Sequence, residues 1–305
     1  MTVLVRSAVV MLSAVLIADA ASAERPPRAP APELTDEDRV AFFDNAFDAL
    51  VGEQPDYGAQ QATELATGDT DAAAGGWADW IDAEALETEI KRLARQAQDA
   101  TRSVAAFKGG ESTRAADALG QVAIAFAVTT RHDGSPRWRD EAAQLAPHFA
   151  RAAAAADAGS DGGYRLGKAA SEDLAALVRG ERPDVGQPAD DVEWGAYASR
   201  SSLMRRMTLA DEQRLPEWTA DRRTFRRKAE DARHEAQVLA MLAEAILAPG
   251  ADDADDPGYQ AYSRQLRAAA ERLRSAAEDE DQPAAAAAAA AIRQSCLDCH
   301  SDYRG

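Results

Sequence analysis

Apolar residues recur at helical spacing along most of this 305-residue chain. In residues 82–107 they fall three and four positions apart, which places them on one side of a helix. They are Leu86, Ile90, Leu93, Ala94 and Ala97. Similar patterns predict helices over 35–51, 112–130, 138–156 and 165–179. The chain is therefore predicted to be all-α.

Four more helices are predicted in the second half of the chain, over about 191–208, 220–248, 258–278 and 283–303. Their short connections imply an antiparallel four-helix bundle. Between the halves, residues 180–190 hold two prolines and two glycines without apolar periodicity, which indicates a domain boundary. We therefore expect a helical domain over 35–180, a linker over 181–190 and the bundle over 191–305.

The N-terminus has the pattern of a secretory signal peptide, residues 1–23. Arg6 gives a short positive region, residues 7–18 are almost wholly apolar, and Ala21-Ser22-Ala23 is a small-residue cleavage site. A membrane anchor is the alternative, but it needs about 20 apolar residues, and Asp19 interrupts the run sooner. We expect cleavage, export to the periplasm and no membrane span in the mature chain.

The mature chain would begin at Glu24 with a linker rich in Pro and Ala over 24–34. With 52 acidic and 34 basic residues, the formal net charge is -18. This excess of acid argues against nucleic-acid binding, which needs clustered Lys and Arg. The main basic run, 222–228, either docks an acidic electron partner or is a solvated first turn of a helix. We favour the solvated turn.

The two cysteines of the chain lie three residues apart and are followed by a histidine. Cys296-Leu297-Asp298-Cys299-His300 is the C-x-x-C-H pattern of covalent haem attachment. On a helix, positions i, i+3 and i+4 project from one face. Both thiols can then add to the vinyl groups of one porphyrin, while the imidazole of His300 reaches the iron from the same side.

Two other uses of a C-x-x-C pair are disfavoured. A thioredoxin-like dithiol needs a βαβ context, which this helical chain lacks. A zinc site needs four ligands, and the remaining histidines, His132, His148 and His234, are scattered along the chain. We expect His234 to lie on the surface of its helix. The two cysteines therefore indicate one covalent haem c.

The residues around the motif indicate which family of c-type cytochromes the chain resembles. The ending Cys296-x-x-Cys299-His300-x-x-Tyr303-Arg304 resembles that of the cytochrome c′ family. Arg200-Ser201-Ser202-Leu203-Met204 is similar to the Arg-x-x-x-Met segment in the first helix of that family. The resemblance covers residues from about 190 to 305.

The resemblance implies a four-helix bundle with the haem near one end and His300 as the proximal iron ligand. Met204, flanked by Leu203 and Met207, would cover the distal face, either as a blocking side chain or as the sixth ligand. Arg200 and Arg304 would each face a haem propionate or modulate the imidazole, or else be ordinary solvated arginines. These alternatives stay open.

The N-terminal half resembles the C-terminal half in the spacing of one helical pair. The pair 82–107 and 112–132 matches the pair 258–278 and 283–300, and an offset of 168 places His132 on His300. The N-terminal half is then a duplicated bundle without haem. The alternative is that alanine-rich helices resemble one another through composition alone.

Three functions agree with these features. The first is an exported mono-haem cytochrome, not an enzyme, that transfers electrons to a partner protein or binds a small gas such as NO or CO. The second is a redox or gas sensor whose N-terminal helical domain binds a partner. The third, a peroxidase-like haem enzyme, is the least favoured, because the first helix offers no distal acid or base around Met204. A homodimer is left open.

Overall fold

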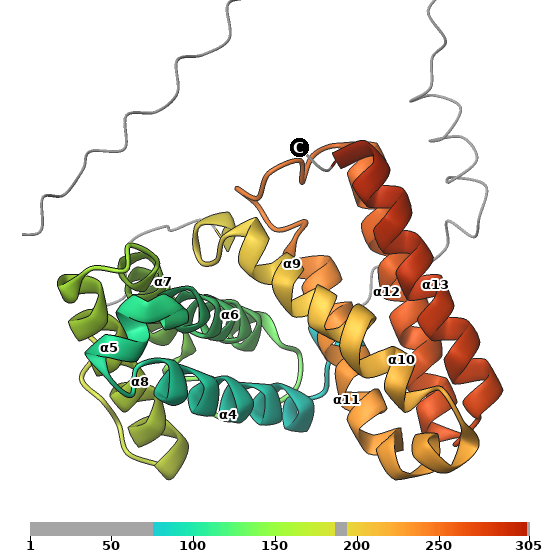
Figure 1. The fold of residues 1–305 in the computed structure, drawn as a ribbon, viewed down its shortest axis with the longest axis horizontal. Helices are drawn as coiled ribbons and strands as arrows, with labels where there is room; N and C mark the ends of the chain where they lie inside the picture. Colours follow the sequence, from blue (N-terminus) through green and yellow to red (C-terminus); the bar gives the residue numbers. More distant parts are fainter. Residues whose placement is uncertain (1–75, 187–193, 304–305) are drawn as a thin grey trace, which may run out of the picture. The chain divides into compact units, whose positions relative to one another are not determined.

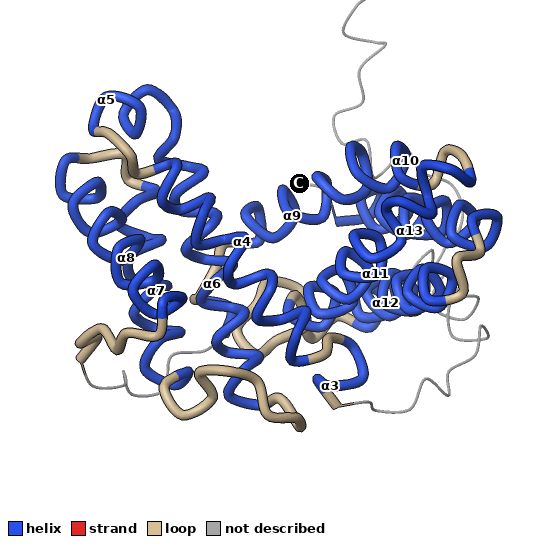
Figure 2. The backbone as a smooth tube through the Cα atoms, turned by 90° about the horizontal axis from the view of Figure 1, so that it is seen from below, coloured by secondary structure: helices blue, strands red, loops and turns tan. Residues whose placement is uncertain are grey.

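The structure is a computed structural model that describes residues 76–186 and 194–303. Every regular element in these two ranges is a helix, which confirms the expected all-α class (Figures 1 and 2). The predicted signal peptide, the linker over 24–34, the helix over 35–51 and Arg304 lie outside the described residues. None of the described helices has the length and apolarity needed to cross a bilayer.

The first helical group consists of four long helices. They are α4 (Ala83–Ala100), α6 (Ser112–Arg131), α7 (Ala142–Asp157) and α8 (Asp161–Arg179). α6 packs on α4 and α7, and α8 closes the group by packing on α7 and α4. The predicted apolar stripe of α4 is buried in this group. α8 ends at Gly180, as expected, with the left-handed φ of 95° that favours glycine.

The break between α4 and α6 comes earlier than the glycines at 109–110 suggest. α4 ends at Ala100, and the hydroxyl of Thr101 donates back to the carbonyl of Ala97 at 2.8 Å. The chain continues through α5 (Val104–Ala106) and the π-helical turn η2 (Phe107–Glu111). Gly110 bends this turn with a φ of 127°.

The second group begins with a shorter first helix than predicted. α9 (Arg200–Thr208) starts at Arg200, because the side chain of Ser199 accepts from the amide of Ser202 and caps the helix. The π-helical turn η4 (Leu209–Arg214) and α10 (Leu215–Trp218) extend it. The sequence predicts an end near residue 208, but the helical segment continues through Pro216, because a proline in the first turn of a helix lacks only an amide that would be unpaired there.

Three longer helices complete the second group. They are α11 (Arg222–Ala245), α12 (Pro257–Glu278) and α13 (Gln282–Tyr303). α12 packs against α11 and α13. Ser263, near the start of α12, donates to the carbonyl of Ala243 at the end of α11. Tyr262 likewise reaches Asp302, at the end of α13, at 2.8 Å. Consecutive helices are therefore antiparallel, as the short connections predict.

The two groups share one hydrophobic core. The described residues fall within a single compact unit, and one cluster of buried side chains runs from Ile81 to Ile292. Trp77 of α3 (Trp77–Trp80) stacks on Trp194 with ring centroids 5.4 Å apart, and Arg131 of α6 covers the same indole. The composition change at 181–190 thus marks the passage from one helical group to the next and not a break in the core.

The alanines of α13 allow a test of the packing between α12 and α13. Ala288 is buried, while Ala290 on the same helix is exposed. Ala288→Leu should lower the free energy of unfolding by about 1–3 kcal/mol, because the added methyl groups overpack the contact. Ala290→Leu should change it by less than about 0.5 kcal/mol. Urea denaturation of both variants measures the difference, and equal effects would contradict this packing.

Candidate functional site

The predicted haem-attachment residues lie together on the last turns of α13. Cys296, Cys299 and His300 are each half-buried and line the same pocket. The pocket encloses about 780 Å³ of space not filled by atoms, part of it continuous with solvent. The spacing of three and four residues places the two sulfurs and the imidazole on one helix face, as the sequence predicts.

The rest of the pocket is lined mainly by apolar and aromatic side chains from other helices. Met204 and Met207 come from α9, Leu266 and Tyr259 from α12, and Ile246 follows α11. Met204 is therefore in the same pocket as His300, where the resemblance expects it. Met207 lines the pocket too and is more deeply buried than Met204.

Arg200 and Leu203 line a second, smaller cavity beside this pocket. Tyr259 and Ile246 belong to both cavities and form the wall between them. The guanidinium of Arg200 lies 5.2 Å from the ring centre of Tyr259 and donates to Asp253 at 2.7 Å. Arg200 is thus an ion-paired arginine next to the pocket.

The two cysteines are free thiols in a partly apolar environment. Burial, with a smaller contribution from nearby Asp211, raises the pKa of Cys296 to about 12. Burial also raises the pKa of Cys299 to about 11. Both sulfurs therefore carry their proton at neutral pH in this environment.

Tyrosines fix the end of α13 against α12. The ring of Tyr303 packs edge-on against Tyr259 and Tyr262, and its hydroxyl donates to Asp256, the N-cap of α12. Tyr262 donates to Asp302 at 2.8 Å. These contacts hold the last turn of α13, and with it His300, against the start of α12.

The phenol of Tyr259 has an unusual environment. The residue is buried at 2% exposure, and its hydroxyl has no hydrogen-bond partner among the described residues. Burial raises its pKa to about 12. A buried hydroxyl without a partner is costly, so this atom indicates that the pocket wall meets a further polar group.

The other three histidines do not line this pocket. The ring of His132 is buried, and its Nε2–H donates to the carbonyl of Ile81 at 2.8 Å. His148 contacts Asp173 at 3.0 Å. His234 is buried against Glu89, so the expectation of a surface histidine is wrong. Neighbouring charges in its own helix suggested exposure, but the partner comes from α4.

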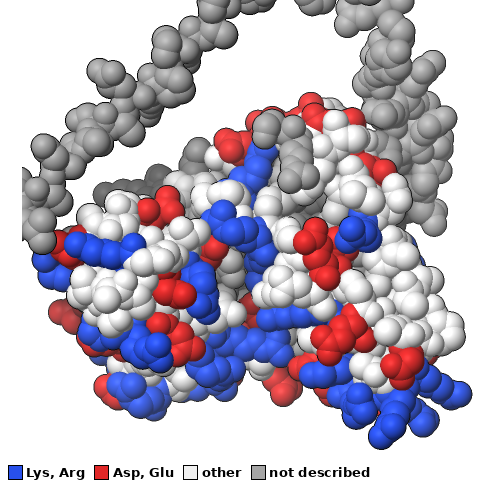
Figure 3. Space-filling view, viewed as in Figure 1, with Lys and Arg blue, Asp and Glu red and all other residues white. Residues whose placement is uncertain are grey.

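The basic run lies far from the pocket. Figure 3 shows basic side chains gathered at the end of the bundle where α11 begins, and Arg222, Arg223, Arg226 and Arg227 are exposed there. Arg226 contacts Glu280, which precedes α13, whereas the cysteines lie at the other end of this 22-residue helix. At 1.5 Å per residue, α13 is about 33 Å long. The arginines of the run are therefore exposed at the end of the bundle away from the pocket, and whether they dock a partner stays a prediction.

Comparison with known families supports the expected resemblance at the C-terminus. Residues 253–304 match the family model described as cytochrome C′. The match spans α12 and α13 with all three residues of the attachment motif. It does not include Arg200 and Met204, so their assignment rests on the cavities that they line. No curated protein and no solved structure matches the chain. The C-terminal region thus has the features of a c-type cytochrome, whose cofactor is haem.

The residues present fit a haem. Two thiols and an imidazole lie on one wall of the pocket, and the other walls combine thioether, aliphatic and tyrosine side chains with the charged Asp211, Glu212 and Arg293. Tyr259 supplies a buried hydroxyl that lacks a partner. In the part of the chain that the structure describes, no three or more His, Cys, Asp or Glu are grouped so that they could hold a metal ion.

The sequence analysis named Met207 only as a neighbour of Met204, and it missed Tyr259 as a pocket residue. Met207 lies three residues after Met204, so helical spacing alone places it on the same face. Tyr259 had no comparable signal, because it reaches the pocket through the antiparallel packing of α12 on α13. The proposed repeat also stays a prediction: α4 and α6 begin the first described group, whereas α12 and α13 end the second.

The unpaired hydroxyl gives a test in protein made without haem attachment. Tyr259→Phe should leave the thermal midpoint unchanged or raise it, because it removes a buried polar atom without a partner. Tyr262→Phe, the control, should cost about 1 kcal/mol, because it breaks the hydrogen bond to Asp302. An equal loss in both variants would show that Tyr259 has a partner in the haem-free protein.

Proposed function

We propose that the protein is an exported c-type cytochrome with one covalent haem, which carries electrons or binds a small gas such as NO or CO. The observation that carries this proposal is the placement of Cys296, Cys299 and His300 on one face of α13, in a pocket that Met204 also lines. The match of residues 253–304 to the cytochrome C′ family supports it.

The chain would hold the haem through three side chains of α13. The thiols of Cys296 and Cys299 each add across a vinyl group, with sulfur bonding to one carbon and the hydrogen passing to the other. His300 would ligate the iron through its imidazole. When bound, the haem supplies a one-electron couple and an iron coordination position for a ligand. This addition needs no oxidant, and it requires both cysteines as free thiols, which they are in this structure.

The role of Met204 decides between the two activities. A thioether bound to iron favours electron transfer, since methionine ligation raises the reduction potential. A thioether that only fills space leaves a coordination position that a gas can reach. Met207 adds a second flexible thioether to the same pocket. Asp211 and Glu212 line the same pocket as Met204 and Met207. We propose a carrier or gas binder and no enzymatic role.

The proposed cellular location rests on the N-terminal sequence. The signal-peptide pattern of residues 1–23 supports export to the periplasm, where haem is attached to the exported chain. A redox partner would dock near the end of α13, where Leu297 is exposed at 54% beside the attachment residues. The distant basic start of α11 does not serve this contact.

Removal of the attachment residues tests the proposal directly. Mass spectrometry of protein matured in a host that attaches haem should show one added haem, which acid acetone does not extract. Cys296→Ala combined with Cys299→Ala should lose covalent haem but keep the helical circular dichroism. His300→Ala should change the optical spectrum, and His148→Ala, far from the pocket, should not. Extractable haem, or a wild-type spectrum in the His300 variant, would refute the proposed site.

The spectrum of Met204→Ala separates the two activities. If Met204 ligates iron, the variant should change from low-spin to high-spin and its reduction potential should fall. If Met204 blocks the site, the haem should be high-spin before and after, and CO should bind faster because the pocket is open. Leu203→Ala, which alters the neighbouring cavity, is the matched control. An unchanged spectrum, potential and CO rate would place Met204 away from the iron.

A further inference from the structure

The helix that carries Met204 has two different faces. Because an α-helix turns once in 3.6 residues, Met204, Met207 and Thr208 lie on one side of α9, and all three line the pocket. Ser202, Arg205 and Arg206 lie on the opposite side. Each of these three contacts a helix of the first group. α9 is thus the layer between the pocket and the N-terminal helices.

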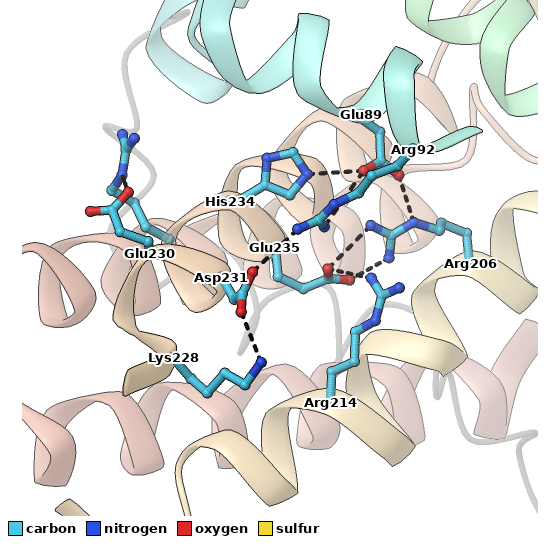
Figure 4. A network of polar contacts seen from close by, with 10 residues as sticks. Glu89, Arg92, Arg206, Arg214, Lys228, Glu230, Asp231, His234 and Glu235 are labelled. Carbon is cyan, nitrogen blue, oxygen red and sulfur yellow. Dashed lines mark hydrogen bonds and ion pairs between the residues drawn. The ribbon is translucent and has the colours of Figure 1, made fainter. Parts of the chain in front are cut away.

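The strongest of these contacts is a buried charge cluster, which we define as Glu89, Arg206, Arg214, His234 and Glu235 (Figure 4). The Nε of Arg206 donates to Glu89 of α4 at 2.9 Å, and its terminal nitrogens donate to Glu235 of α11. Arg214 of η4 donates to Glu235 at 2.6 Å. The Nε2–H of His234 donates to Glu89 at 2.9 Å.

Two carboxylates face two guanidinium groups in this cluster, and its central groups are almost fully withdrawn from water. The side chains of Glu89 and Arg206 are each 4% exposed, and that of Glu235 is 0% exposed. Burial alone would raise the pKa of Glu89, but Arg206 and the hydrogen bond from His234 hold it well below its usual value. Glu89 is therefore a buried anion. If α9 moved away, Glu89 would lose the guanidinium of Arg206, and a buried charge without its partner is costly.

Two contacts with α6 reinforce the same face of α9. Arg205 donates to both oxygens of Asp117, at 2.7 and 2.6 Å, in the two-pronged geometry that fixes an arginine most firmly. The side-chain amide of Gln121 donates to the carbonyl of Ser202 at 3.3 Å. α9 is nine residues long and is continued by a π-helical turn, so these external contacts determine its position more than its own hydrogen bonds do.

We propose that Glu89 and Asp117 of the N-terminal helices are positioning residues for the distal wall of the haem pocket: by fixing α9, they set how Met204 lies relative to the iron. This inference rests on the proposed function for the iron itself, while the anchoring of α9 stands on the contacts alone. It gives the first helical group a role at the site. A partner that moved α4 or α6 would change the distal side of the haem.

The anchoring can be tested without any haem. Hydrogen exchange of the full chain should show faster exchange over residues 200–208 in Glu89→Gln, by about tenfold or more, since breaking a buried ion pair strongly destabilises its surroundings. Asp117→Asn, whose partner Arg205 is half exposed, should act in the same direction on a chain that still folds. Glu87→Gln is the control, because Glu87 lies on α4 but pairs with Lys91 and Arg137. Unchanged exchange over 200–208 in both variants would overturn the anchoring.

The effect on iron needs the haem-loaded protein. Glu89→Gln and Asp117→Asn should change the CO association rate by about threefold or more, or the fraction of low-spin haem, while Glu87→Gln should not. Both effects should disappear in a Met204→Ala background, because residues that act through one another are not additive. A spectrum and CO rate that stay constant while exchange over 200–208 increases would overturn the positioning role. A protein that takes up no covalent haem would instead refute the proposed function and leave the exchange result intact.

Discussion

The guanidinium of Arg206 joins three helices that are distant in sequence. It lies between carboxylates of α4 and α11, and all three side chains are at most 4% exposed. A buried ion pair adds little stability compared with well-packed apolar side chains, but removal of one partner is costly. The cluster therefore contributes mainly by fixing the position of α9 between the first helical group and the pocket. The pocket wall with Met204 and Met207 depends on that position.

The long helices and the attachment motif could be predicted from sequence because both depend on local spacing. The stripe of α4, the end of α8 at Gly180 and the face shared by Cys296 and His300 all follow from a period of 3.6 residues. The start of α9 was harder to predict from sequence, because it depends on the capping side chain of a single serine, Ser199. The passage through Pro216 was missed because the proline lies where its missing amide does no harm.

The burial of the charge cluster could have been predicted from the positions of its residues in the sequence. Glu89 follows Leu86 by three residues, Arg206 follows Leu203 by three, and Glu235 follows Ala232 by three. Each charged residue thus occupies an apolar position of its own helix and is expected to be buried. Three such residues of mixed sign indicate that they pair, although the sequence cannot say which helix meets which. The burial of His234 follows from the same unpredicted contact, since its partner is Glu89.

The position of the pocket follows from the change of side-chain size along α13. In its first half, small side chains such as Ala285 and Ala288 are buried and let α12 approach closely. In its last turns, larger side chains meet α12: the rings of Tyr259, Tyr262 and Tyr303 pack against one another, and hydrogen bonds to Asp256 and Asp302 hold the rings in place. The pocket lies at this end of α13, where the cysteines and histidine also lie. The same composition that makes α13 a strong helix therefore also determines the end at which a cofactor fits.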